Sequence, residues 1–142
     1  MKLLNKRILI LIALMTFGVI GNAFAGITHV NNATLAELIE QGVPVIDVRR
    51  ADEWTDTGTI DGSHLITFFD KNGRYDADAW LAKLDKLVSI DEPFVLICAA
   101  GVRSRNIAQL LDARLGYTAV HNVKKGINHW IAKGQEVVPH SP

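Results

Sequence analysis

The chain contains one cysteine, Cys98, and the residues that follow it could stabilise a reactive thiolate. An apolar run ends at Cys98 and leads into a loop of small or apolar residues, Ala99, Ala100, Gly101 and Val102. A free thiol is only a few per cent ionised at pH 7, so a nucleophilic cysteine needs groups that favour its anion. None of these loop side chains competes for backbone N–H groups, and Gly101 can adopt a positive φ. The loop can therefore turn several N–H groups toward the sulfur.

The next two residues extend this predicted anion-binding loop. Arg103 adds a fixed cation with a planar fork of donors, and Ser104 can either donate to the sulfur or cap the helix that begins there. A helix N-terminus alone contributes roughly 0.3–1 kcal/mol, up to about 2, whereas each charge-assisted hydrogen bond adds roughly 1.5–3 kcal/mol. We therefore predict Cys98 as a nucleophile, with the N–H groups of Gly101, Val102 and Arg103 as the main donors.

Other uses of this cysteine remain open at this point. The structural alternative is a small apolar residue that fills the end of a core strand. A cysteine phosphatase or an arsenate reductase would need a roomier loop than the four residues between Cys98 and Arg103. A thiol–disulfide oxidoreductase normally uses two cysteines separated by two residues, and here Gly101 stands at the second position. The spacing favours a single extra sulfur atom over a phosphoryl group.

Strands and helices are predicted to alternate around this loop. Apolar runs indicate strands over residues 44–48, 64–68, 94–97 and 118–120. Helical spacing and capping residues indicate helices over 32–41, 51–54, 76–89 and 125–133, and another that contains 107–115 and ends at Gly116. This alternation predicts an α/β fold with a parallel sheet covered on both faces. In such sheets ligands bind beyond the carboxyl ends of the strands, where Cys98 and Asp47 are expected.

The first 25 residues have the three-part pattern of a secretory signal peptide. A basic start is followed by an apolar run over residues 8–20 and by small residues around Ala25. The run is shorter than the ~18–20 residues that span a bilayer, so an uncleaved membrane anchor is the weaker alternative. We expect cleavage near Ala25 and export to the periplasm, with residues 26–142 forming one domain and no stable membrane insertion after cleavage.

Composition excludes several classes of partner and cofactor. The whole chain has no formal net charge, and three of its basic residues lie in the first 25, so the remainder is mildly acidic. Nothing in this balance predicts binding to nucleic acid or to an anionic membrane. One cysteine cannot form an internal disulfide, and the five histidines show no metal-ligand spacing. We expect no metal and no other cofactor.

These motifs together resemble the rhodanese (thiosulfate sulfurtransferase) family in its single-domain form. Residues 98–104 match its C-x-x-G-x-R-S loop, and residues 45–49 followed by Glu53-Trp54 match its D-x-R…E-aromatic signature. Residues 58–63 resemble its G-H-I-x-G-A segment, and residues 116–130 resemble its C-terminal G-[YF]…G-G-x-x-x-W. The matches occur in the family's order over roughly residues 28–134. Three positions depart from the pattern: Thr59, Ser63 and Lys125.

The resemblance implies a rhodanese-like domain with a five-stranded parallel sheet and a two-step reaction. The Cys98 thiolate would take the outer sulfur of a donor such as thiosulfate, form a persulfide and release sulfite. The persulfide would then pass this sulfur to cyanide, a thiol or an exported protein acceptor. A non-catalytic sulfur carrier or sensor that hands sulfur to a protein partner would use the same residues, so this alternative stays open.

Three further residues are expected to support the loop or the donor. The resemblance implies that Asp47 braces the active-site loop. We place Asp47 and Arg49 on opposite faces of their strand and expect Arg49 to pair with Glu53, because opposite charges four residues apart commonly form local pairs. The resemblance also places Lys125 near the pocket mouth, where it could attract a dianionic donor. The alternative for Lys125 is a solvated surface lysine.

Overall fold

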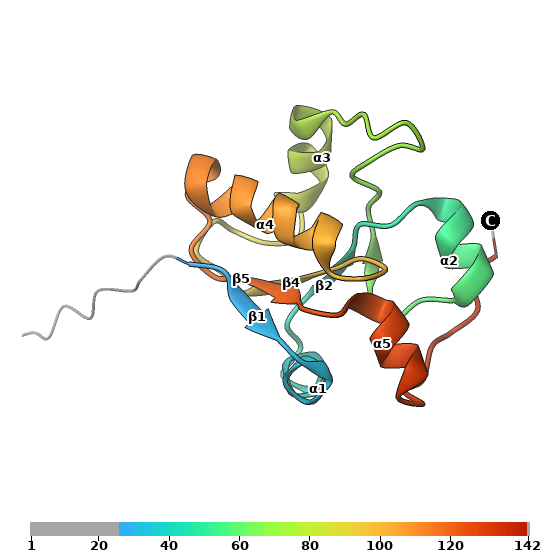
Figure 1. The fold of residues 1–142 in the computed structure, drawn as a ribbon. Helices are drawn as coiled ribbons and strands as arrows, with labels where there is room; N and C mark the ends of the chain where they lie inside the picture. Colours follow the sequence, from blue (N-terminus) through green and yellow to red (C-terminus); the bar gives the residue numbers. More distant parts are fainter. Residues whose placement is uncertain (1–25, 142) are drawn as a thin grey trace, which may run out of the picture.

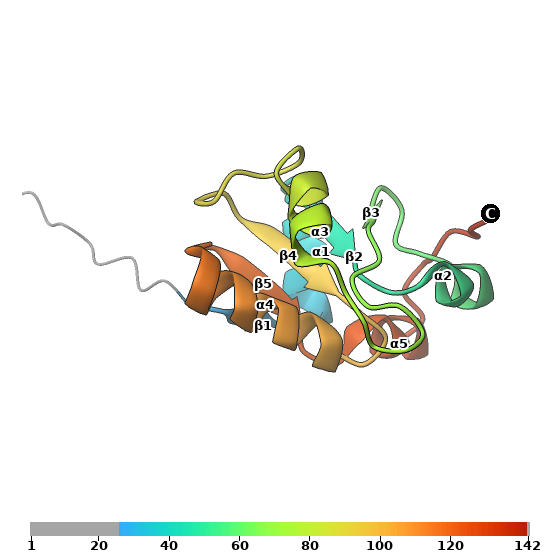
Figure 2. The same cartoon turned by 90° about the horizontal axis from the view of Figure 1, so that it is seen from above.

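A computed structural model describes residues 26–141 and contains one five-stranded sheet in which all strands are parallel. The strand order is β1-β5-β4-β2-β3, so the two strands that precede the predicted site residues, β2 and β4, are neighbours. The twisted sheet forms the middle layer of the molecule (Figures 1 and 2). The strands are β1 (Thr28–Val30), β2 (Val45–Asp47), β3 (His64–Leu65), β4 (Phe94–Ile97) and β5 (Val120–Val123).

Helices cover both faces of the sheet, as the strand and helix pattern predicts. Alternate residues of β4 point to opposite faces: Leu96 packs in the core beneath α3 and α4, and Val95 packs in the core beneath α1 and α5. Figure 1 shows these two layers, with α2 beside α5 at the right of the sheet. The helices are α1 (Asn32–Glu40), α2 (Ala51–Thr57), α3 (Ala77–Leu84), α4 (Val102–Leu115) and α5 (Gly126–Ala132).

Several element boundaries differ from the sequence prediction. Asn31 rather than Asn32 caps α1, because its side chain accepts a hydrogen bond from the Thr34 N–H. Helix α2 runs three residues beyond the predicted single turn, and α3 ends five residues before Ser89. Strand β5 begins where the predicted strand 118–120 ends. The edge strand β1 was not predicted, since it has only three residues, two of them exposed.

The register of the sheet brings the carboxyl ends of β2 and β4 to the same edge. Asp47 is paired with Ile97, the residue before Cys98. Helix α4 begins a few residues after this edge, and the β5–α5 turn lies against it. Within the described residues, no helix is both long enough and apolar enough to cross a membrane. The predicted signal peptide lies outside the described part of the chain.

Candidate active site

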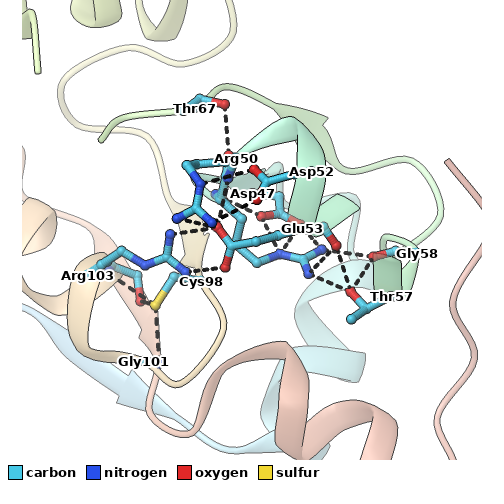
Figure 3. Close-up of polar contacts among 12 residues, drawn as sticks. Asp47, Arg50, Asp52, Glu53, Thr57, Gly58, Thr67, Cys98, Gly101 and Arg103 are labelled. Carbon is cyan, nitrogen blue, oxygen red and sulfur yellow. Dashed lines mark hydrogen bonds and ion pairs between the residues drawn. The ribbon is translucent and has the colours of Figure 1, made fainter. Parts of the chain in front are cut away.

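The Cys98 sulfur lies at the carboxyl end of β4 and accepts hydrogen bonds from three donors. The Gly101 N–H donates to Sγ at 3.2 Å, the Ser104 hydroxyl at 3.3 Å and the Ser104 N–H at 3.4 Å (Figure 3). Gly101 has a φ of 84°, which glycine adopts without a steric penalty. Helix α4 begins at the next residue, directly beside the sulfur. This arrangement favours a sulfur anion, because every one of these contacts presents a hydrogen to it.

The donors differ in part from those predicted from the sequence. Gly101 is a donor, as expected, but the second backbone donor is Ser104. The N–H groups of Val102 and Arg103 make no hydrogen bond to Sγ, although they belong to the first turn of α4, where N–H groups have no partner inside the helix. Of the other loop residues, Ala99 is half-buried and Ala100 is exposed.

Helix α5 orients the loop by donating hydrogen bonds to the carbonyl groups of the loop. The Ile127 N–H donates to the Cys98 carbonyl at 2.9 Å, and the Asn128 N–H donates to the Ala99 carbonyl at 3.0 Å. The C=O and N–H of a trans peptide point in opposite directions, and the described chain has no cis peptide. The N–H groups of Ala99 and Ala100 therefore point away from α5.

Two glycines allow the β5–α5 turn to lie directly against the loop. A Cβ atom on Gly126 would lie 2.3 Å from the Ala99 carbonyl oxygen. A Cβ atom on Gly101 would lie 2.2 Å from the Lys124 carbonyl oxygen. Both contacts are with backbone, which cannot rotate away as a flexible side chain can. Any larger residue at either position would push the loop away from α5.

Arg103 forms an ion pair with Glu53 of α2. Its Nη1 lies 2.8 Å from Oε2 of Glu53, and its Nη2 lies 2.5 Å from Oε1 (Figure 3). The hydrogen bond from Arg103 is the main reason why the pKa of Glu53 is lowered. The hydrogen bond to Glu53 likewise raises the pKa of Arg103, and the nearby charges of Glu53, Cys98 and Asp47 raise it further. The guanidinium group is therefore a permanent cation close to the sulfur.

The predicted roles of Asp47 and Arg49 are corrected by the structure. Strand β2 ends at Asp47, so Arg49 lies in the bend after the strand and not on its opposite face. The two side chains face each other and form a buried ion pair at 2.8 Å. The predicted pairing with the Glu53 carboxylate does not occur, since Arg49 bonds Glu53 only at its backbone carbonyl. Arg49 also donates to Thr57 Oγ1 and to the Gly58 carbonyl. The pair thus ties the end of β2 to α2, and Asp47 makes no hydrogen bond to the Cys98 loop.

Lys125 precedes α5 and is exposed. Its two chain neighbours, Lys124 and Gly126, both lie against the backbone of the Cys98 loop. Lys125 is therefore part of the turn that faces this loop. Cys98 itself is only 1% exposed, while Val102 in the same loop is 52% exposed. The sulfur therefore lies directly beneath a surface loop. Within residues 26–141, no cluster of three or more His, Cys, Asp or Glu side chains could hold a metal ion.

Sequence reasoning assigned the wrong partner to Glu53 and did not identify Asn122, and both residues contact this loop or the residue after it. Glu53 is fifty residues from Arg103 in the chain, and nothing in the local sequence joins them. Asn122 is 1% exposed on β5, and its Nδ2 donates to the Gly101 carbonyl at 3.5 Å. An asparagine among the apolar residues of a central strand was the available signal, because a polar side chain buried there needs a partner.

Comparisons with known proteins agree with this fold. The family model described as "Rhodanese-like domain" matches residues 31–133. A protein named thiosulfate sulfurtransferase GlpE from Actinobacillus pleuropneumoniae serotype 3 is 34% identical over 99 residues, which are 69% of this chain and 81% of the relative. The serotype 7 protein of the same name is 33% identical over the same shares of both chains.

Solved structures give the same result. A rhodanese-related protein from Thermoplasma volcanium is 31% identical, with a TM-score of 0.58 over 80% of this chain and 99% of its own. A rhodanese-like domain protein from Staphylococcus aureus is 25% identical, with a TM-score of 0.60 over the same shares. The family model covers well over half of the chain. The chain therefore belongs to the rhodanese-like domain family.

Proposed function

We propose that this protein is a sulfurtransferase that moves a sulfane sulfur from thiosulfate, or a similar donor, to a thiophilic acceptor through a persulfide on Cys98. The observation that carries the proposal is the set of three hydrogen-bond donors around Sγ, from Gly101 and Ser104. Hydrogen bonds of this kind stabilise a thiolate before the reaction and a persulfide anion after it. The relatives named thiosulfate sulfurtransferase support the same reaction class.

In the first half-reaction one S–S bond forms and one S–S bond breaks. The Cys98 thiolate attacks the outer sulfur of thiosulfate, and a new S–S bond forms. The S–S bond of the donor breaks, and its electron pair leaves with sulfite. The N–H groups of Val102 and Arg103, which have no acceptor in the helix, are suited to bind the terminal sulfur of the persulfide.

The second half-reaction restores the enzyme. An acceptor such as cyanide or a thiolate attacks the terminal sulfur of the persulfide, and the electron pair of the breaking S–S bond returns to Cys98. The donor and the acceptor must both reach a sulfur that is 1% exposed. The reaction therefore requires a small movement of the groups around the sulfur.

The first prediction tests the persulfide directly. Thiosulfate added to the protein lacking residues 1–25 should increase its intact mass by one sulfur atom, and excess cyanide should remove this mass. A Cys98→Ser variant should gain nothing. A wild-type protein that stays unmodified while it hydrolyses an aryl phosphate would support the phosphatase alternative instead. A persulfide that forms but passes to no small acceptor would support the sulfur-carrier alternative.

We also propose that the protein is exported and works in the periplasm. This proposal rests on the basic, apolar and small-residue pattern of the first 25 residues. The second prediction is that full-length protein expressed in a bacterium is recovered from the periplasmic fraction with an N-terminus at or near Gly26, as measured by intact mass. Recovery of the uncleaved chain from the cytoplasm would contradict it.

A further inference from the structure

Asn122 is a polar side chain buried inside the sheet, and the reaction described so far does not use it. It lies on β5 between Leu96 of β4 and His29 of β1, and it is 1% exposed. Its side chain points to the α4 side of the sheet, because Val120, two residues before it, belongs to the core beneath that helix. A buried amide needs hydrogen-bond partners, so its partners indicate what it does.

The Asn122 amide nitrogen bridges the active-site loop and the edge strand β1. Nδ2 donates to the Gly101 carbonyl at 3.5 Å and lies 3.1 Å from Nδ1 of the exposed His29. An amide nitrogen carries two hydrogens, so it can serve both partners when Nδ1 is the unprotonated nitrogen of a neutral imidazole. The amide oxygen Oδ1 is buried and has no partner within the described residues. The orientation of the amide therefore depends on these two contacts.

The contact with Gly101 orients the peptide that begins α4. The Gly101 carbonyl also accepts the Arg105 N–H at 3.3 Å, the first hydrogen bond of the helix. The Gly101 carbonyl and the Val102 N–H belong to one trans peptide and point in opposite directions. Because Asn122 holds the carbonyl on the β5 side, the Val102 N–H points away from β5. This N–H is one of the two donors assigned above to the terminal sulfur of the persulfide.

Protonation of His29 removes the acceptor that the amide uses. A protonated imidazole donates from both nitrogens, so Nδ1 can no longer accept from Asn122 Nδ2. A half turn of the amide brings Oδ1 to the Nδ1 hydrogen and gives Oδ1 a partner. The same turn brings Oδ1 instead of Nδ2 to the Gly101 carbonyl, where two acceptors cannot form a hydrogen bond. The charge of His29 therefore determines whether the Gly101 carbonyl keeps its bond from Asn122.

The other titratable groups near His29 do not take over this role. Strand β5, which pairs with β1, has one titratable residue, His121, which points to the opposite face and whose pKa is lowered by burial. No carboxylate forms an ion pair with His29 within residues 26–141. Helix α4 packs against β5, and its charged residues are Arg103, Arg105, Asp112 and Arg114. Asn122 is thus the direct link between His29 and the loop.

We propose that Asn122 is a positioning residue for sulfur transfer and that His29 controls it through its protonation. Neutral His29 keeps the amide donating to the Gly101 carbonyl, and the Val102 N–H stays in place for the persulfide. Protonated His29 turns the amide, and the first peptide of α4 loses this anchor. The protein therefore accepts sulfur more slowly in mildly acidic solution than the loss of thiolate alone requires. This inference rests on the proposed sulfurtransferase function.

The test compares persulfide formation from thiosulfate in wild type and His29→Gln, by intact mass over time. Glutamine does not titrate, and its amide oxygen can accept from Asn122. The two proteins should react equally at about pH 8, and wild type should be about fivefold slower at about pH 5, where histidine side chains are generally protonated. The ionisation of Cys98 is common to both proteins and cancels in this ratio. The charge of His29 acting alone would have the opposite sign, because a nearby cation favours the thiolate.

Two further variants make the result specific. His64→Gln changes a half-buried histidine on the other edge strand, β3; it is the matched control and should follow wild type at both pH values. Asn122→Leu removes the donor at similar volume and should be about fivefold slower than wild type at about pH 8. Adding His29→Gln to Asn122→Leu should change nothing further at either pH. If Asn122→Leu does not fold, the comparison of wild type with His29→Gln still decides, since residue 29 is exposed.

The outcomes separate this inference from the proposed function. If thiosulfate forms the persulfide but wild type and His29→Gln have the same relative rate at both pH values, His29 does not control the loop and the inference is wrong. A wild type that is the faster protein in acid contradicts it as well. If folded Asn122→Leu reacts as fast as wild type, Asn122 is not a positioning residue. If wild type forms no persulfide at either pH, the proposed function fails and this inference fails with it.

Discussion

Three arginines around α2 use their hydrogens in different ways. Arg49 is 1% exposed, and each of its side-chain nitrogens is bonded to Asp47, Thr57 or a backbone carbonyl, so it has a structural role. Arg50 is partly exposed and bonds Asp52 through Nε and Nη2. Arg103 alone of the three keeps its Nε fork free of hydrogen bonds within the described chain. Residue type therefore gives no indication of which arginine can bind an anion, but the number of donors already in use does.

The positive charge of Lys125 predicts a salt-dependent effect on the binding of thiosulfate. It is exposed on the turn that faces the Cys98 loop, and it stands where the family pattern has glycine. If it attracts the thiosulfate dianion, Lys125→Gly should raise the KM for thiosulfate at least twofold at low ionic strength and less at high ionic strength, where the Debye length is shorter. Steady-state kinetics at ~0.01 M and ~0.5 M salt measure this difference. An equal KM for both proteins at both salt concentrations would leave Lys125 a solvated surface residue.

At the scale of elements, the contact between α5 and the Cys98 loop holds the reactive geometry. Gly126→Ala would place a Cβ atom 2.3 Å from the Ala99 carbonyl, so the loop must move. We expect persulfide formation to slow by about 100-fold, as a displacement of about 1 Å can cause. Gly134→Ala is the matched control, because Gly134 has a similar positive φ of 73° but no atom within 4 Å of the added Cβ. This control should lose similar backbone stability and keep its rate; equal rates for the two variants would contradict the role of the contact.

The elements that were predicted well are those whose own residues determine them. Phe94–Ile97 forms β4 as expected, since four consecutive apolar residues are typical of a strand buried on both faces. Gly116 ends α4 in the left-handed conformation, again as expected. The edge strand Thr28–Val30 could not be predicted, because its pairing with β5 depends on residues more than ninety positions away. The predicted extension of α3 to Ser89 also failed, because the chain turns at Asp85 although apolar residues continue to Val88.

At the scale of the whole molecule, the sheet brings together residues that the sequence keeps apart. The motif over residues 98–104 identifies the sulfur and most of its donors, because these residues are neighbours in the chain. The partner of Arg103 depends instead on the register of β2 and β4, which places α2 beside the start of α4. From the sequence alone, Glu53 was predicted to pair with Arg49, four residues away, because local spacing indicates only contacts between near neighbours. Tertiary pairing overrides this local preference.

The Glu53–Arg103 ion pair should make the stability of the molecule depend on pH. The hydrogen bond from Arg103 lowers the pKa of Glu53 in the folded protein. The stabilisation is therefore fully present above the unfolded value of about 4.3 and is lost as the pH falls through the lower folded value. We expect Glu53→Gln to reduce the free energy of unfolding by roughly 1 kcal/mol at pH 7, and this difference from wild type should shrink toward pH 3. Urea unfolding at several pH values measures it, with Asp61→Asn, an exposed carboxylate without an ion pair in the described chain, as the control. A difference that stays constant from pH 7 to about pH 3 would show that the variant acts by changing packing and not by removing the charge of the pair.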